Sequence, residues 1–188
     1  MISCVVTARN PDVSLLRVTV KSALDAGVNE VVLVDNGSDE PIVMPRARTR
    51  VVRFADTQGE DDAFRFGAIE ARYEWIVRLE AGDAILGNKI RQVGVTVAQG
   101  ADGSVSPHYD TAVDRDVWPE STFKASTAVM RRDAVLHDNA RDWRVFPEVT
   151  AIAQPSSRAI DIDFSSAPTE TGAVRDDAAQ CVVETENG

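Results

Sequence analysis

The sequence predicts an α/β fold, with a mostly parallel sheet flanked by helices in a single domain. Short apolar runs rich in Val and Ile alternate with helical spacings along the first half of the chain. This alternation favours parallel strands joined by right-handed crossovers. With 188 residues and 44% hydrophobic residues, the chain has the size and apolar content of one packed domain.

The first half of the chain gives the clearest elements. An apolar run over 2–7 predicts a strand, and apolar residues at helical spacing predict a helix after it. Asp12 suits the N-cap of this helix and Gly27 its C-terminal stop. The same reading predicts three further strands, over 30–34, 51–54 and 75–79. It also predicts helices over 60–73 and 89–99.

The second half of the chain is less regular. A helix is expected near Pro147, because proline suits the first helical turn. The other expected elements are a strand over 103–106, a polar loop over 109–123, a strand over 125–130, a helix over 131–137 and a strand over 159–164. From Ser165 onward the residues are mostly small and polar, which predicts a loosely packed tail.

Charge and composition disfavour several classes of protein. The 20 Lys and Arg against 30 Asp and Glu give a net charge of −10, whereas nucleic-acid binding depends on clustered positive charge. No apolar run is long enough for a transmembrane helix, and the N-terminus lacks the basic flank of a signal peptide. Cys4 and Cys181 form no metal-binding or disulfide pattern. We therefore expect a cytoplasmic protein.

Polar turns follow three of the predicted strands. In an open α/β sheet, ligands bind at the carboxyl ends of the strands, so these turns should surround one crevice. The turns are Thr7-Ala8-Arg9-Asn10, Asp35-Asn36-Gly37-Ser38 and Glu80-Ala81-Gly82-Asp83. Carboxylates placed in this way are suitable ligands for Mg²⁺ or Mn²⁺. Each turn taken alone is equally consistent with a purely structural role, since Asp, Asn and Gly dominate turns.

Two other nucleotide-binding classes fit the sequence poorly. A nucleotidyltransferase needs a glycine-rich loop after the first strand, but residues 7–14 contain no glycine. A Rossmann oxidoreductase needs G-x-G-x-x-G at the same place, and this motif is also missing there.

The order and spacing of the turns resemble nucleotide-sugar-dependent glycosyltransferases of the GT-A (Rossmann-like) fold, in particular the inverting family 2. The resemblance covers 2–98, roughly half the chain, with shorter matches at 126–132 and 146–148. Its motifs are a strand with a P-T-Y-N-like turn, V-D-D-G-S, N-x-G-x-x-x-A-R-N-x-G and L-D-x-D-D. They correspond here to Val5–Asn10, Val34–Ser38, Thr57–Gly67 and Leu79–Asp83.

The resemblance implies an enzyme that moves a sugar from a nucleotide-diphospho-sugar to a hydroxyl acceptor, with inversion and with help from Mn²⁺ or Mg²⁺. Donors of the UDP or dTDP type are favoured, and the acceptor is left open. The same resemblance divides the single domain into a nucleotide-sugar-binding half over 1–98, an acceptor-side half over 99–165 and the tail over 166–188.

The resemblance also assigns site residues. Glu148 matches the catalytic base, and Glu80 and Asp83 match the metal-binding carboxylates. The residues implied to bind the donor nucleotide are Thr7, Ala8, Arg9, Asp35, Asn36, Arg65 and Glu80.

The chain departs from the family motifs at several of these positions. Asn36 stands where the family has a carboxylate that faces the base, and Gly82 replaces the middle acidic residue. Phe64 stands where the family has Arg, and Arg65 follows it, which suggests a guanidinium shifted by one position. These departures leave open an alternative: a catalytically weak or inactive GT-A domain that binds a nucleotide, a sugar or a partner protein.

Overall fold

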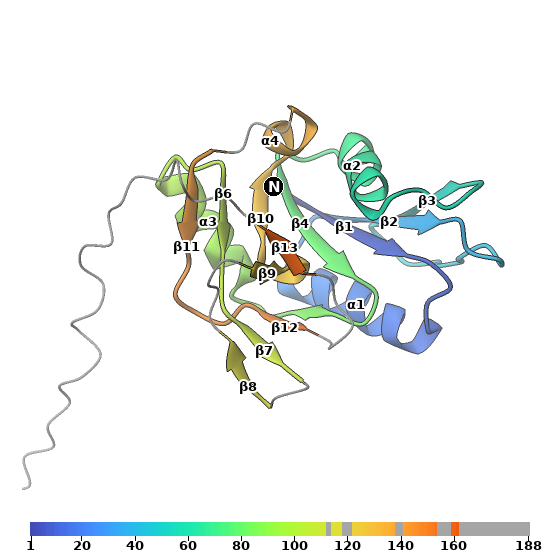
Figure 1. The fold of residues 1–188 in the computed structure, drawn as a ribbon, viewed down its shortest axis with the longest axis horizontal. Helices are drawn as coiled ribbons and strands as arrows, with labels where there is room; N and C mark the ends of the chain where they lie inside the picture. The colour runs from blue at the N-terminus through green and yellow to red at the C-terminus, as the bar shows by residue number, and fades with distance from the viewer. Residues whose placement is uncertain (112–113, 118–121, 138–140, 154–158, 162–188) are drawn as a thin grey trace, which may run out of the picture.

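The computed structural model describes residues 1–111, 114–117, 122–137, 141–153 and 159–161. It confirms the predicted α/β fold with a mostly parallel central sheet. Seven strands form this sheet in the order β11-β6-β10-β4-β1-β2-β3, which Figure 1 shows from left to right.

Four parallel strands form the half of the sheet that lies toward β3. They are β1 (Ile2–Ala8), β2 (Glu30–Asn36), β3 (Thr49–Phe54) and β4 (Trp75–Glu80). β1 pairs with both β2 and β4, so the ends of these three strands lie side by side. The sheet continues through the antiparallel β10 (Val129–Arg131), then β6 (Gly103–Val105) and β11 (Trp143–Val145).

Four helices belong to the described part of the chain: α1 (Val13–Ala26), α2 (Glu60–Glu70), α3 (Lys89–Ala98) and α4 (Arg132–His137). The caps predicted for α1 are confirmed. The Asp12 side chain accepts hydrogen bonds from the backbone N–H groups of Ser14 and Leu15, at 2.7 and 3.1 Å. Gly27 ends the helix with a φ of 100°, a left-handed conformation that glycine adopts without strain.

The strands β1, β2 and β4 have two different faces. Val6, Leu33 and Leu79 belong to a buried apolar cluster with Leu16 and Val20 of α1, and we call this side the α1 face. The opposite side, the α2 face, carries a smaller cluster that contains Val5, Val34 and Ile76 of the strands with Ala63 and Phe64 of α2.

Gly67 allows α2 to approach the sheet closely. A Cβ atom at this position would lie 2.4 Å from Val5 Cγ1 and 2.8 Å from Val34 Cγ2, well inside normal contact distance. The glycine is therefore needed because the helix packs directly on two β-branched side chains of the α2 face.

A polar cluster is buried where α3 meets the second half of the chain. The Lys89 side chain is fully buried, and its Nζ donates to Gln92 Oε1 and to the Thr127 carbonyl, both at 3.0 Å. Burial lowers the pKa of Lys89 from 10.5 to about 7, a shift that an interaction with Cys4 opposes. Gln92 also donates to Ser104 Oγ at 3.1 Å, which ties α3 to β6.

The second half departs from the sequence predictions. The expected loop over 109–123 contains strands, and two small sheets lie beside the central one. One consists of β5 (Ala84–Ile85), β12 (Ala151–Ala153), β7 (His108–Asp110) and β8 (Arg115–Val117). The other pairs β9 (Thr122–Lys124) with β13 (Ala159–Asp161). A 3₁₀ helix over Ala125–Thr127 occupies the first part of the strand predicted over 125–130.

The helix predicted near Pro147 is wrong. Residues 146–150 form an irregular segment between β11 and β12. Phe146 is buried and its N–H donates to the Val105 carbonyl at 2.7 Å, while the Thr150 N–H donates to the Pro107 carbonyl at 3.3 Å. These long-range hydrogen bonds override the local preference of proline for a helix start.

Two expectations fall wholly or partly outside the described residues. The tail over 166–188 lies outside them, as does the part of the predicted strand that follows Asp161. Within the described residues, the structure contains no helix whose length and apolar character would allow it to cross a membrane.

Candidate donor-binding site

A cavity of about 300 Å³ lies at the carboxyl ends of β1, β2 and β4. The strand register explains its position, because Thr7 pairs with Glu80 and Ala8 pairs with Asp35 across the neighbouring strands. The wall is completed by the turn after β1, by Leu15 of α1, by Glu60 at the start of α2 and by Ala81 after β4. As predicted, the turns after the three strands therefore meet at one edge of the sheet.

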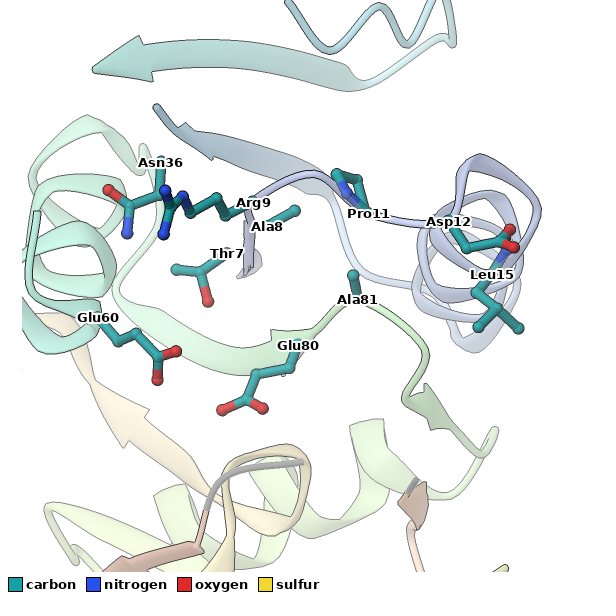
Figure 2. Close-up of a pocket in the computed structure, with 10 residues that line it drawn as sticks. All are labelled: Thr7, Ala8, Arg9, Pro11, Asp12, Leu15, Asn36, Glu60, Glu80 and Ala81. Atoms are coloured by element: carbon teal, nitrogen blue, oxygen red, sulfur yellow. The ribbon is translucent and has the colours of Figure 1, made fainter. Parts of the chain in front are cut away.

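Five of the predicted site residues line this cavity: Thr7, Ala8, Arg9, Asn36 and Glu80. Figure 2 shows the Arg9 guanidinium beside the Asn36 amide at one end of the cavity. At the other end, the carboxylates of Glu60 and Glu80 are directed into the same space, with the Thr7 hydroxyl between them. One end of the cavity therefore carries the cationic Arg9 and the neutral Asn36, and the other end carries the two carboxylates.

Sequence reasoning missed Glu60. It is the first residue of α2, and the sequence pattern identifies it only as the start of the helix predicted over 60–73. Its place directly after the Thr57-Gln58-Gly59 segment was the available signal, because that segment matches a family motif.

Asp35 is buried and has a structural role in the turn. Its carboxylate accepts hydrogen bonds from the backbone N–H groups of Ser38 and Ile42, at 2.9 and 3.1 Å, and forms an ion pair with Arg53 at 2.8 Å. Burial alone would raise the pKa of Asp35, but the hydrogen bonds and the Arg53 charge outweigh it and hold the pKa below its usual value. Asp35 does not line the cavity, so it supports the cavity wall only through the turn that it stabilises.

Asn36 joins the end of β2 to the segment before α2. Its Nδ2 donates to the Gln58 carbonyl at 3.0 Å, and its Oδ1 accepts from the Gln58 N–H at 2.8 Å. An aspartate would lose one of these two bonds, because a carboxylate accepts but does not donate. The amide keeps one N–H and one lone pair for other partners.

Gly37 brings the same two segments together. Its φ is +70°, and a Cβ atom at this position would lie 2.6 Å from the Thr57 backbone nitrogen. The glycine is needed both for the left-handed backbone and for the close approach of residues 56–57.

The acidic turn after β4 places its two carboxylates differently. The Asp83 N–H donates to the Glu80 carbonyl at 3.1 Å, and Gly82 takes a φ of 107° within this turn. Glu80 lines the cavity, whereas the Asp83 side chain is fully buried and is not part of the cavity wall. Across the described ranges, no three His, Cys, Asp or Glu side chains are grouped closely enough to hold a metal ion.

The structure does not bring Arg65 or Glu148 to the cavity. The Arg65 guanidinium donates to the Leu136 carbonyl, so it joins α2 to α4. The Glu148 carboxylate forms an ion pair with Arg91 of α3 and accepts from Asn88 Nδ2 at 3.3 Å.

Comparison with solved structures identifies similar folds. A structure of residues 1–349 of TarS from S. aureus matches with a TM-score of 0.64 and 13% identity, over 81% of this chain and 60% of TarS 1–349. The complex of TarS 1–349 with UDP-GlcNAc matches with a TM-score of 0.61, and the complex with UDP with 0.59. Both complexes are also 13% identical over 81% of this chain, and cover 58% and 60% of their own chains.

The chain therefore spans about 60% of the length of these TarS structures. No curated protein sequence matches it. The model of the family described as "Glycosyl transferase family 2" matches residues 3–159, which include every cavity-lining residue. The protein therefore belongs to glycosyl transferase family 2.

Proposed function

We propose that this chain transfers a sugar from a nucleotide-diphospho-sugar of the UDP type to a hydroxyl acceptor, with inversion at the sugar. The observation that carries the proposal is the cavity at the ends of β1, β2 and β4, with Arg9 and Asn36 at one end and Glu60 and Glu80 at the other. Family membership and the UDP-GlcNAc complex of a structural neighbour support the same class of donor.

The nucleoside would occupy the end of the cavity near Arg9 and Asn36. The remaining amide N–H and lone pair of Asn36 give it one donor and one acceptor for a base edge. The planar Arg9 guanidinium beside it is suited to stack on a base or to bind an oxygen of the nucleotide. Thr7 and Ala8 would line the path from the base toward the diphosphate.

The acidic end of the cavity has a donor set that suits Mg²⁺ or Mn²⁺. Glu80 and Glu60 direct carboxylates into one space with the Thr7 hydroxyl, and oxygen ligands of this kind are those that hard cations prefer. Glu80 and Glu60 would hold the ion, with Asp83 supporting the turn behind Glu80, and diphosphate oxygens would complete the shell. When bound, the ion would neutralise charge on the leaving diphosphate.

An inverting transfer also needs a carboxylate that takes the proton of the acceptor hydroxyl. We assign this role to Glu148 on the basis of the family resemblance. Its ion pair with Arg91 holds the carboxylate beside α3, so the assignment requires the 146–150 segment to turn Glu148 toward the acceptor.

A panel of UDP-, dTDP-, GDP-, CDP- and ADP-sugars tests the proposal through donor hydrolysis and thermal shift, with and without Mn²⁺. We expect hydrolysis of a UDP-type sugar, and a loss of about 100-fold in rate for Glu80→Gln because a carboxylate that would hold the metal ion is removed. Glu40→Gln changes an exposed carboxylate outside this cavity and should leave the rate unchanged. A wild-type protein that neither binds nor hydrolyses any UDP-sugar would overturn the proposal.

A second function, nucleotide or sugar binding without turnover, has its own supporting observations. Gly82 has replaced one acidic residue, and the described ranges contain no three-residue metal cluster. The same panel of donors distinguishes the two functions. A binding module would show a thermal shift with UDP and Mn²⁺ but no hydrolysis or transfer with any donor of the panel.

A further inference from the structure

Arg78 of β4 occupies an unusual position for an arginine. It lies on a central strand and is only 4% exposed. Its Nη1 contacts Asp61 Oδ1 at 3.1 Å, and its guanidinium carbon lies 4.7 Å from the centre of the Phe64 ring. Its Nε and Nη2 are buried and have no hydrogen-bond partner among the residues that the structure describes.

Burying such a side chain lowers the stability of the folded protein, so its presence calls for an explanation. Arginine stays protonated in proteins, so it cannot escape the cost of burial by losing its charge. Unpaired N–H groups of a buried cation add to that cost. The ion pair offsets little of it, because the Asp61 side chain is 67% exposed and screened by water. A buried cation of this kind therefore points to a function.

The strand geometry places Arg78 directly beneath the acidic end of the cavity. Alternate residues of a strand face the same side, so Arg78 and Glu80 both belong to the α2 face. Arg78 pairs with Val5, and the next pair on this face is Thr7 with Glu80, which line the cavity. The partner of Arg78, Asp61, is the neighbour of Glu60 in the first turn of α2.

Arg78 lies next to the position of α2 where the family resemblance predicts a guanidinium. Phe64 stands where the family resemblance predicts an arginine, and Arg65, the expected substitute, is bonded to Leu136 away from the cavity. The Arg78 guanidinium lies over the ring of Phe64 itself. The aromatic ring is thus on the helix and the cation on the strand.

We propose that Arg78 supplies the positive charge of the diphosphate-binding end of the cavity, from strand β4 instead of helix α2, and positions the first turn of α2 through Asp61. This inference rests on the proposed nucleotide-sugar function. A buried charge is weakly screened, so its field lowers the cost of bringing a diphosphate close to Glu60 and Glu80. Arg78 is a positioning residue, because it acts through Asp61 and the first turn of α2. Its measurable consequence is a preference for ligands that carry phosphate charge over uncharged ligands.

Calorimetry of the full chain at fixed Mg²⁺, with inorganic pyrophosphate, UDP and uridine as probes, tests this inference. For Arg78→Met we expect a loss of at least about tenfold in affinity for pyrophosphate and UDP, with uridine nearly unchanged. Arg78→Lys keeps the charge and should stay within about threefold of the wild type. Arg17→Met, a control at an exposed arginine of α1 outside the cavity wall, should bind all three probes as the wild type does.

The inference is overturned if folded Arg78→Met binds pyrophosphate as tightly as the wild type, or loses UDP and uridine affinity equally. Circular dichroism and melting curves establish folding. If Arg78→Met does not fold, Arg78→Gln removes the charge while keeping a donor for Asp61, and the same criteria apply. The exchange Phe64→Arg with Arg78→Phe returns the guanidinium to the helix, and should retain pyrophosphate binding.

These probes separate failure of the inference from failure of the proposed function. A wild type that binds pyrophosphate through Arg78 but does not bind UDP would overturn the nucleotide-sugar function and support the role of Arg78. A wild type that binds UDP with no dependence on Arg78 would support the nucleotide-sugar function and overturn the role of Arg78. A wild type that binds neither probe would overturn both.

Discussion

The α1 face and the α2 face of the central sheet are built from alternate residues of the same three strands, yet they differ in chemistry. The α1 face is an apolar cluster in which strand residues such as Leu33 and Leu79 pack with Leu16. On the α2 face, the strands end in polar residues that line the cavity, and Arg78 is buried beneath them.

The difference shows how a sheet divides stability and function. Because successive side chains of a strand point to opposite faces, one face can be fully apolar while the other carries charges. Burial of apolar surface on the α1 face stabilises the strands, and this stability holds the polar ends of the α2 face in place. The two faces should therefore respond differently to mutation.

Leu16→Ala should have the largest effect on stability. Leu16 is fully buried on the α1 face, so the substitution removes apolar contacts and leaves a cavity. We expect a loss of about 3 kcal/mol in the free energy of unfolding, with nucleoside diphosphate affinity unchanged in the folded protein. Urea unfolding measures the first quantity and calorimetry the second. Val18→Ala, 53% exposed on the same helix, is the control and should change stability little.

Gly67→Ala should have the next largest effect on stability. Because Gly67 lies on the α2 face, we expect this substitution to weaken ligand binding as well. The added Cβ would meet Val5 Cγ1 at 2.4 Å, so α2 must move away from the sheet. We expect a loss of about 2 kcal/mol in the free energy of unfolding. Because α2 carries Glu60, weaker binding of UDP should accompany this loss.

Gly94→Ala serves as the control for Gly67→Ala. Gly94 lies within α3, and a Cβ there would meet nothing within 4 Å, so the alanine should stabilise the protein by up to about 1 kcal/mol. If Gly67→Ala destabilises the protein while UDP affinity stays at the wild-type level, the link between α2 packing and the cavity is wrong.

The buried Lys89 predicts that the free energy of unfolding depends on pH. Its pKa is lowered from 10.5 to about 7, so between these values the unfolded chain binds a proton that the folded protein does not. The contribution of Lys89 to the free energy of unfolding should therefore rise with pH across this window, by on the order of 1 kcal/mol for each pH unit near its middle. Below about pH 7 the full cost of burying the charge remains.

The measurement compares urea unfolding of the wild type and of Lys89→Met at several pH values between 7 and 10. The wild type should gain stability relative to the variant as the pH rises. Parallel stability curves for the two proteins would show that Lys89 keeps its proton in the folded state.

Asn36→Asp should have the smallest effect, at the polar end of the α2 face. The aspartate cannot donate to the Gln58 carbonyl, which should cost about 1 kcal/mol of stability. An aspartate only accepts hydrogen bonds, so it should favour uracil and thymine, which carry a ring N–H, over cytosine and adenine, which lack one on the base-pairing edge, by roughly one decade in affinity.

Competition among uridine, thymidine, guanosine, cytidine and adenosine diphosphates measures the preference for bases. An equal loss of affinity for all five would mean that Asn36 holds the Gln58 segment and does not read the base.

The first half of the chain follows its sequence closely, and the second half does not. β1, β2 and β4 are mostly apolar runs that are buried almost throughout, so local pattern and tertiary burial agree. In the second half most strands, including β8 and β12, have three residues, too few for a recognisable alternation. Their existence depends on partners far along the chain, as β12 depends on β5 and β7.

The candidate site was predictable where it depends on the parallel strands of the first half of the chain. Thr7, Arg9 and Glu80 were identified because parallel strands bring their carboxyl ends to one edge whatever the details of packing. Glu60 and Arg78 were missed because a helix start and a strand residue show no local sign of facing a cavity. The structure shows that Glu60 shares the cavity with Glu80. It also shows that Arg78 lies over the ring of Phe64.

The sequence by itself determined the main strands and helices of the first half, the caps of α1 and the edge of the sheet where the cavity lies, because periodicity, capping and strand direction are local properties. Only the tertiary structure decided which polar groups meet. It directed the Asp35 carboxylate to Arg53, the Asn36 amide to Gln58 and the Arg78 guanidinium to Phe64. These pairings depend on the approach of segments that lie 14 to 22 residues apart in the chain, and residue spacing alone does not encode that approach.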